Sequence, residues 1–92
     1  MKYVVDLTEK AKDGVKKFKK AGDKQALKKL EQLLEELEVH PKTGSGRPKL
    51  LVGYDGERWS RRITDKHRLV YEIFEEVVTV EVIQTYGHYD DK

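Results

Sequence analysis

The sequence predicts a single α+β domain over residues 1–92. Its expected elements are a strand, a two-helix hairpin and then a four-stranded antiparallel meander. Apolar residues recur at helical spacing through the first forty residues, and the alternation typical of strands begins at Lys49. Short clusters of Gly, Asp and Glu then separate the later segments. Because each helix has one apolar face, we expect both helices to pack on the same face of the sheet.

The first strand is expected over residues 2–7, and Thr8 or Asp6 is a suitable cap for a helix over 9–21. Apolar side chains of that helix fall on one narrow face, and these are Ala11, Val15, Phe18 and Ala21. Gly14 lies in the same segment and weakens the helix by about 1 kcal/mol relative to alanine. This helix therefore needs support from packing.

A second helix is predicted to begin after Asp23, a good N-cap, and to end before Pro41. Its wide apolar stripe consists of Leu27, Leu30, Leu33, Leu34 and Leu37. The stripe covers barely two heptads, whereas a dimerising coiled coil needs about three or four. Packing into the core of the domain is the better interpretation, and the two helices are expected to form an antiparallel hairpin.

Residues 41–48 contain two glycines and two prolines and are predicted to be a connector. Their Gly-Ser-Gly lacks both the Walker lysine and the dinucleotide-binding spacing, so it is weak evidence for a phosphate cradle. After this connector the strands are expected over 49–53, 57–64, 67–74 and 77–86.

Charge is distributed unevenly along the chain. Residues 41–71 hold eight basic and three acidic side chains, a net charge of +5, whereas residues 72–92 hold one and six, a net charge of −5. Five of the eight cations are arginines, whose planar guanidinium suits phosphate. Side chains alternate along a strand, so Arg62 points to the face of the sheet away from the apolar Trp59 and Ile63. Arg68 lies on the same face as Arg62 if the strand registers allow it. The sequence therefore predicts that an open, arginine-rich sheet face binds a polyanion.

The composition excludes several classes of protein. The chain has no cysteine, which excludes disulfides, thiolate catalysis and cysteine-ligated metals. Its apolar runs are only two or three residues long and its start shows no signal-peptide pattern, so we expect a cytoplasmic protein with no membrane partner. No cofactor and no metal are expected, because even His88, Asp90 and Asp91 lack a defined ligand spacing.

Four short runs stand out in the second half of the chain: Gly44–Pro48, Trp59–Ile63, His67–Tyr71 and Gly87–Tyr89. In this order and at these separations they closely resemble the YoeB/Txe toxins of the RelE superfamily. The resemblance implies the RelE/YoeB-like fold and a ribosome-dependent endonuclease that cleaves mRNA in the ribosomal A site. It also implies a toxin–antitoxin pair with a YefM/Phd-like antitoxin, while a homodimer stays an open alternative.

By the same resemblance, the catalytic arginine of the family falls on Arg68, a supporting phosphate-binding arginine on Arg62, and the C-terminal His-Tyr pair on His88 and Tyr89. Lys49 stands where these toxins usually have a glutamate acting as general base. Two roles follow for Lys49: a base kept partly neutral by the arginines around it, or the mark of a weakened nuclease. The other expected RNA-binding cations are Arg47, Arg61 and Lys66.

The chemistry expected of such a site needs few groups. The ribose 2′-OH attacks the adjacent phosphorus, so one proton is removed, one is donated to the leaving 5′-oxygen, and negative charge on the phosphate is stabilised. Arg62 and Arg68 would bind the phosphate oxygens and His88 would protonate the leaving group, while Tyr89 would orient or stack on a base. His67 is expected to support Arg68 rather than to take part in the chemistry.

Two alternatives remain from the sequence. In the first alternative the chain has the same fold but no full nuclease activity. It would then be either a ParE-like inhibitor of a protein target or a module that binds RNA or the ribosome. A plain interaction module would use the basic sheet face to bind an acidic protein. The pair His88 and Tyr89 favours the nuclease, because an interaction module has no use for it beside two arginines.

Overall fold

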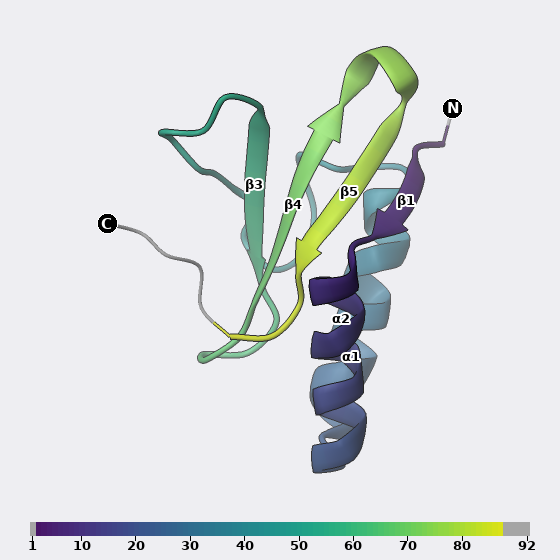
Figure 1. Ribbon diagram of the computed structural model, residues 1–92, viewed down its shortest axis with the longest axis vertical. Helices are drawn as coiled ribbons and strands as arrows, with labels where there is room; N and C mark the ends of the chain where they lie inside the picture. Colours follow the sequence, from purple (N-terminus) through teal and green to yellow (C-terminus); the bar gives the residue numbers. More distant parts are fainter. Residues whose placement is uncertain (1, 88–92) are drawn as a thin grey trace.

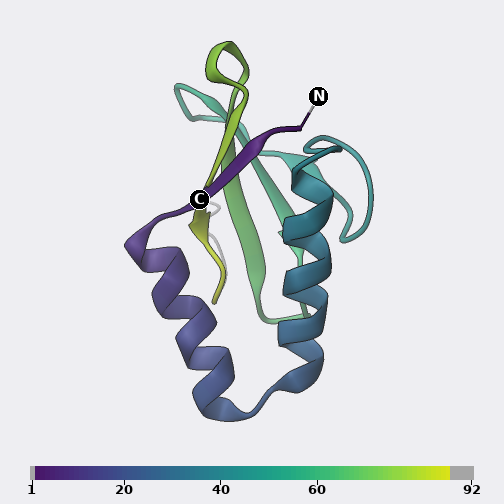
Figure 2. The same cartoon turned by 90° about the vertical axis from the view of Figure 1, so that its right-hand side faces the viewer.

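A five-stranded mixed sheet carries both helices on one face (Figures 1 and 2). The computed structural model describes residues 2–87. The elements in chain order are β1 (Val4–Leu7), α1 (Glu9–Ala21), α2 (Lys24–Leu37), β2 (Lys49–Leu50), β3 (Glu57–Arg62), β4 (Arg68–Phe74), the 3₁₀ turn η1 (Glu75–Val77) and β5 (Thr79–Gln84). This is the α+β fold that the sequence predicts.

The strand order in the sheet is β1-β5-β4-β3-β2. Strands β2 to β5 form the predicted antiparallel meander. β1 lies parallel to β5, with Val4 opposite Thr79 and Leu7 opposite Val82. The sequence gives no indication of this pairing, because it joins the first strand to the last across the whole chain. It leaves β2 and β3 at the opposite edge of the sheet.

Both helix starts follow the capping residues expected from the sequence. The Thr8 hydroxyl accepts a hydrogen bond from the Ala11 amide at 3.2 Å, and the Asp23 carboxylate accepts one from the Ala26 amide at 3.1 Å. Between the helices Gly22 adopts a left-handed conformation with φ of 69°, which glycine accepts without strain. These local signals set the hairpin in place.

The hairpin buries its apolar stripe against the sheet. Buried side chains of the helices meet buried side chains of β4 and β5, and the larger of them are Phe18, Leu30, Leu33, Leu37, Leu69, Tyr71, Val80 and Val82. Leu30, Leu33 and Leu37 of the leucine stripe are buried in this core and the other two leucines pack against it partly buried, so the interpretation as core packing is confirmed. Within residues 2–87, neither helix has the length and apolar character needed to cross a membrane.

Close packing explains why α1 contains a glycine at position 14 despite its low helix propensity. A Cβ atom at this position would lie 2.1 Å from the Thr85 hydroxyl oxygen and 3.0 Å from the backbone nitrogen of Tyr86. Thr85 in turn donates a hydrogen bond to the Ala11 carbonyl at 2.6 Å. Glycine therefore lets α1 approach the end of β5 closely, at the cost of a weaker helix.

All five strands are shorter than the sequence predicts, and two of them differ most. The strand expected over 49–53 ends after Leu50, although the Leu51 amide still bonds the Arg58 carbonyl at 2.8 Å. The strand expected over 77–86 begins only at Thr79, because η1 uses Val77 and Val78 adopts a left-handed conformation with φ of 47°. The β4–β5 pair has a β-bulge where Val70 and Tyr71 pair with Gln84 and Val82, whereas the β2–β3 and β3–β4 registers are regular and decide where the site lies.

Candidate functional site

A pocket of about 200 Å³ opens at the β2–β3 side of the sheet. It is lined by Gly46, Arg47, Lys49, Ser60, Arg62 and Arg68. These residues come from the loop before β2 and from three neighbouring strands. Four of the cations that the sequence analysis singled out are therefore brought together.

Strand register places the two central arginines side by side. Arg62 on β3 is paired directly with Arg68 on β4, so both side chains stand on the same face of the sheet. Lys49 on β2 is paired with Ser60 in the same way. The register condition that the sequence left open for Arg62 and Arg68 is thus confirmed.

Arg68 is the more fixed of the two arginines. One nitrogen of its guanidinium, Nη1, donates to the carbonyls of Thr64 at 2.6 Å, Asp65 at 3.0 Å and His67 at 3.2 Å. These three acceptors belong to the β3–β4 turn and its edge. The side chain is therefore oriented before any ligand binds, which lowers the entropy cost of binding a phosphate.

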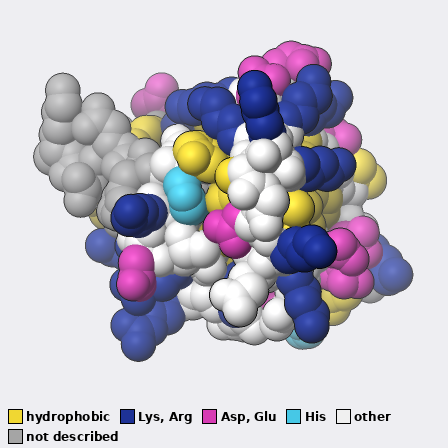
Figure 3. Space-filling model, turned by 90° about the horizontal axis from the view of Figure 1, so that it is seen from below, with side chains coloured by type: hydrophobic (Ala, Val, Ile, Leu, Met, Phe, Trp, Pro, Cys, Tyr) yellow, Lys and Arg dark blue, Asp and Glu magenta, His cyan; other side chains and the backbone are white. Residues whose placement is uncertain are grey.

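The pocket is strongly positive. No carboxylate is found among its lining residues within the described part of the chain. Arg62 lies 3.7 Å from Asp65, whose side chain is 96% exposed, so this ion pair is weak. Lys and Arg side chains also surround much of the end of the molecule seen in Figure 3. A small anion such as a phosphate is the ligand that this pocket suits.

The loop before β2 is fastened to the pocket rather than being a loose connector. The Gly46 carbonyl accepts a hydrogen bond from the Arg62 amide at 2.7 Å. Gly46 has φ of 80°, and a Cβ atom there would lie 3.0 Å from the Arg62 carbonyl oxygen. Arg47, the next residue, is also left-handed with φ of 53°. The glycine thus permits the close approach that brings Arg47 to the site.

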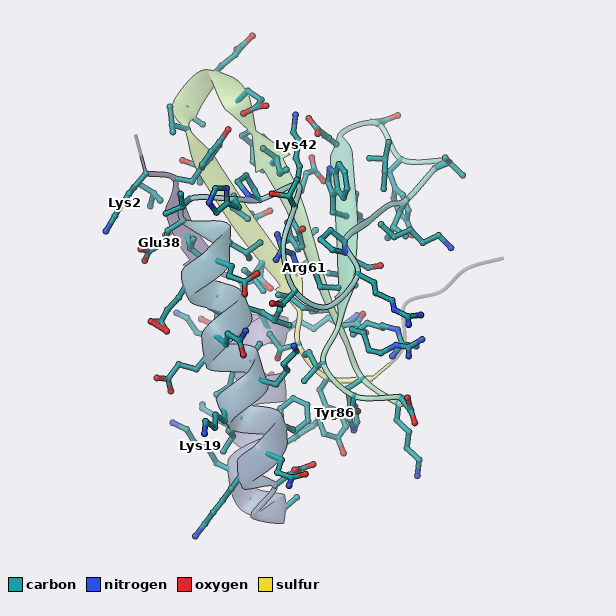
Figure 4. The ribbon with its side chains drawn as sticks, turned by 180° about the vertical axis from the view of Figure 1, so that it is seen from behind. Lys2, Lys19, Glu38, Lys42, Arg61 and Tyr86 are labelled. Carbon is teal, nitrogen blue, oxygen red and sulfur yellow. The ribbon has the colours of Figure 1, made fainter. Side chains whose placement is uncertain are left out.

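Arg61 corrects a prediction. The sequence analysis expected it to bind RNA phosphate, but its side chain is completely buried beside α2 (Figure 4). It donates to Glu36 Oε1 at 2.9 Å and to the Tyr71 hydroxyl at 3.0 Å. It also donates to the backbone carbonyls of His40, Thr43 and Ser45. A guanidinium occupied in this way is unavailable to RNA.

The Arg61 contacts hold the loop that carries Gly46 and Arg47. Glu36 Oε1 also accepts the Ser45 amide at 2.8 Å. Burial raises the pKa of the Glu36 carboxyl, but hydrogen bonds from Ser45 and Gln32 and the charge of Arg61 outweigh it, so the pKa lies below its usual value. The carboxylate therefore stabilises the fold above about pH 4.5, and that contribution is lost as the pH falls through the lowered pKa.

Of the remaining predicted residues, the structure describes only Lys66. Lys66 is exposed in the β3–β4 turn and does not line the pocket. His88 and Tyr89 lie outside the described residues. Ser60, which the sequence analysis did not select, is buried and lines the pocket. Its position two residues before Arg62 on the same strand was the available signal, because alternate residues share a face.

His67 has a structural environment. Its ring packs edge-on to Phe18 with 4.9 Å between ring centroids and lies 4.2 Å from the Tyr86 ring. Burial lowers the pKa of its imidazole, as do the nearby charges of Lys66 and Arg68, while Asp23 acts in the opposite direction. Its backbone carbonyl accepts a hydrogen bond from Arg68 Nη1 at 3.2 Å, a contact that does not involve the imidazole.

Comparison with known proteins gives one consistent result. Residues 7–89 match the family described as YoeB-like toxin of bacterial type II toxin-antitoxin system. Toxin RelK of Mycobacterium tuberculosis is 38% identical over 60 residues, which are 65% of this chain and 71% of RelK. Toxin YoeB of Escherichia coli K12 is 36% identical over 58 residues, which are 63% of this chain and 69% of that toxin.

Solved structures agree with the sequence matches. The YoeB/ParE toxin from Agrobacterium tumefaciens is 31% identical with a TM-score of 0.84, and the match covers 94% of this chain and 99% of that chain. A chain of the heterotetrameric YoeB–YefM toxin–antitoxin complex from Staphylococcus aureus is 27% identical with a TM-score of 0.77. That match covers 97% of this chain and all of the other.

Proposed function

The chain belongs to the YoeB-like toxins of bacterial type II toxin–antitoxin systems, whose known activity is ribosome-dependent cleavage of mRNA, and we propose that its cationic pocket is the cleavage site. The observation that carries the proposal is that four cations line the same pocket, namely Arg47, Lys49, Arg62 and Arg68. Its charge and size suit one phosphate of an RNA backbone. In this proposal the substrate is the mRNA in the ribosomal A site.

The reaction that this pocket supports is attack of a ribose 2′-OH on the neighbouring phosphorus. The bond from the 2′-oxygen to phosphorus forms, the bond from phosphorus to the 5′-oxygen breaks, and the products carry a 2′,3′-cyclic phosphate and a free 5′-OH. Negative charge grows on the phosphate oxygens during the attack. Arg62 and Arg68, side by side and close to those oxygens, stabilise that charge, so the proposed mechanism requires no metal.

Two proton transfers complete the reaction. Lys49 lines the pocket and is our proposed base for the 2′-OH. His88 is the proposed acid for the 5′-oxygen, with Tyr89 stacking on a base of the substrate. Their support is the sequence position, because they follow Gly87, whose carbonyl accepts the Arg68 amide at 2.9 Å. The end of the described chain is therefore hydrogen-bonded to the start of β4.

Lys49→Met and Lys49→Glu test the proposed base. Both substitutions are expected to slow cleavage, and Met is expected to cost roughly 10² to 10⁴-fold, the usual contribution of general acid–base catalysis. The measurement is single-turnover cleavage of mRNA on purified ribosomes. Lys28→Met is the control, because it removes an exposed lysine of α2 that does not line the pocket.

The two Lys49 variants separate the alternatives. If Lys49 marks a weakened site, Lys49→Glu raises the rate above that of the original chain. If neither variant changes the rate, Lys49 takes no part in the chemistry, and the base comes from another group such as His88 or the ribosomal RNA.

Partners follow from the same proposal. The Staphylococcus aureus relative forms a complex with YefM, and another structure is described as a YoeB dimer. We propose that a YefM/Phd-like antitoxin covers Arg62 and Arg68 in this protein and blocks access of RNA. Because the proposed substrate lies on translating ribosomes, we propose that the free toxin is cytoplasmic.

A further inference from the structure

Gly87 is the last described residue, and its amide and its carbonyl are hydrogen-bonded to the consecutive residues His67 and Arg68. Its amide donates a hydrogen bond to His67 Nδ1 at 2.9 Å. Its carbonyl accepts one from the Arg68 amide, also at 2.9 Å. No strand pairing extends to this point, since β5 ends at Gln84. The His67 side chain therefore supplies one of the two bonds that fix where the chain leaves the domain.

The His67 ring is itself held in one orientation. Phe18 of α1 packs against it at an interplanar angle of 83°, and the Tyr86 ring lies tilted by 40° on it. Figure 4 shows Tyr86 beside the helical hairpin at this end of the molecule. The two aromatic contacts fix the plane of the ring, and within that plane the hydrogen bond to the Gly87 amide selects the orientation with Nδ1 toward Gly87, because the flipped ring would present a carbon atom there.

We propose that His67 is a positioning residue for cleavage, because its Nδ1 anchors the Gly87 amide and so fixes the start of the C-terminal segment beside Arg68. The inference rests on the proposed function, in which the next residue, His88, donates the proton to the leaving 5′-oxygen. His67 touches no substrate in this account. It acts through the backbone of Gly87, whose φ of 89° suits glycine and turns the chain at this point.

The anchor depends on protonation. Nδ1 accepts a hydrogen bond only when it carries no proton, so the neutral ring holds its proton on Nε2. Charged groups near the ring are Asp23 between the helices, Lys66 and Arg68 beside it, and Lys17, which lies 5.3 Å from the centre of the Tyr86 ring. Burial acts with Lys66 and Arg68 to lower the pKa of His67 below its usual value of about 6.5.

The sign of the pH effect follows. The unfolded chain binds a proton at His67 more readily than the folded chain, so the contribution of His67 to stability is complete above about pH 6.5. It is lost as the pH falls through the lowered pKa of the folded state. The Gly87 anchor is therefore intact at neutral pH and is released in acid.

Two substitutions separate the anchor from the packing. His67→Phe keeps an aromatic ring between Phe18 and Tyr86 but removes the acceptor. His67→Asn loses the ring but places an amide oxygen near the position of Nδ1, and this oxygen does not titrate. The readouts are hydrogen exchange of the Gly87 amide by NMR between pH 5 and 8, and kcat and KM for cleavage of ribosome-bound mRNA.

We expect the Gly87 amide of His67→Phe to exchange about fivefold faster at pH 7.5, the effect of one lost hydrogen bond, and kcat to fall by about 10- to 100-fold with KM nearly unchanged. His67→Asn is expected to restore slow exchange and most of kcat, and to remove the loss of protection in acid, where protection is the exchange rate relative to that of an unstructured amide at the same pH. Normal exchange or normal kcat in His67→Phe overturns the inference, as does a failure of His67→Asn to rescue either.

Failure of the proposed function looks different. In that case the original chain does not cleave mRNA on the ribosome at all, while the exchange of Gly87 still responds to the substitution at His67. The exchange measurement therefore tests the anchor, and the cleavage by the original chain tests the function.

Discussion

Arg68→Ala is expected to lower the rate of mRNA cleavage on the ribosome by a factor on the order of 10² to 10³. The guanidinium lies in the pocket directly opposite Arg62, held by three carbonyls of the β3–β4 turn. In the proposed mechanism its positive charge is already in place when negative charge develops on the phosphate in the transition state. The rate is measured under single-turnover conditions, so that substrate binding and product release do not hide the effect.

Arg58→Ala is the matched control. Arg58 lies on β3 as Arg62 does, but it pairs with Glu72 at 2.8 Å and does not line the pocket. Its removal should leave the cleavage rate within about twofold to threefold, since it touches neither phosphate nor pocket. Equal losses of activity and of thermal stability in Arg68→Ala would instead make Arg68 a structural residue.

Arg61→Met is expected to cost about 3 to 5 kcal/mol of the free energy of unfolding, which is the usual result of removing one member of a buried ion pair. Glu36 loses its cation, and the carbonyls of His40, Thr43 and Ser45 lose their donor. A methionine side chain fills part of the space but supplies no hydrogen bond. Denaturation in urea, followed by circular dichroism, measures the loss.

The neighbouring substitution Arg62→Met provides the comparison. Arg62 is exposed, and its ion pair with Asp65 is long and solvated, so its replacement should change stability by no more than about 0.5 kcal/mol. The two adjacent arginines should therefore behave in opposite ways, because Arg61 holds the interior together whereas Arg62 is proposed to bind the substrate phosphate. Similar stability losses in both variants would contradict the assignment of Arg61 to the interior.

The different fates of these arginines show what could be read from the sequence. Strand alternation correctly placed Arg62 on the open face. The same alternation puts Arg61 on the face of Trp59 and Ile63, a signal for burial that the sequence analysis did not use. The sequence analysis nevertheless counted Arg61 among the RNA-binding cations. What it lacked were the acceptors, because Glu36 and the carbonyls of residues 40–45 are distant in sequence and are brought to Arg61 only by the folded loop.

Local signals predicted the helices well, because the caps Thr8 and Asp23 and the leucine stripe all act within a few residues. Long-range features were less accessible. The parallel pairing of β1 with β5 and the seating of Gly46 against Arg62 depend on contacts between distant segments. The same applies to the His67 anchor, since nothing near His67 in sequence indicates that its ring accepts the Gly87 amide.

Mapping the 5′ ends of an mRNA translated in a purified system, with and without this protein, tests the central claim most directly. The account predicts new 5′ ends at a fixed distance from the ribosomal A site, which require ribosomes and disappear when Arg68→Ala replaces the original chain. Intact mRNA on translating ribosomes in the presence of the original chain, or cleavage that is the same with Arg68→Ala, would contradict it.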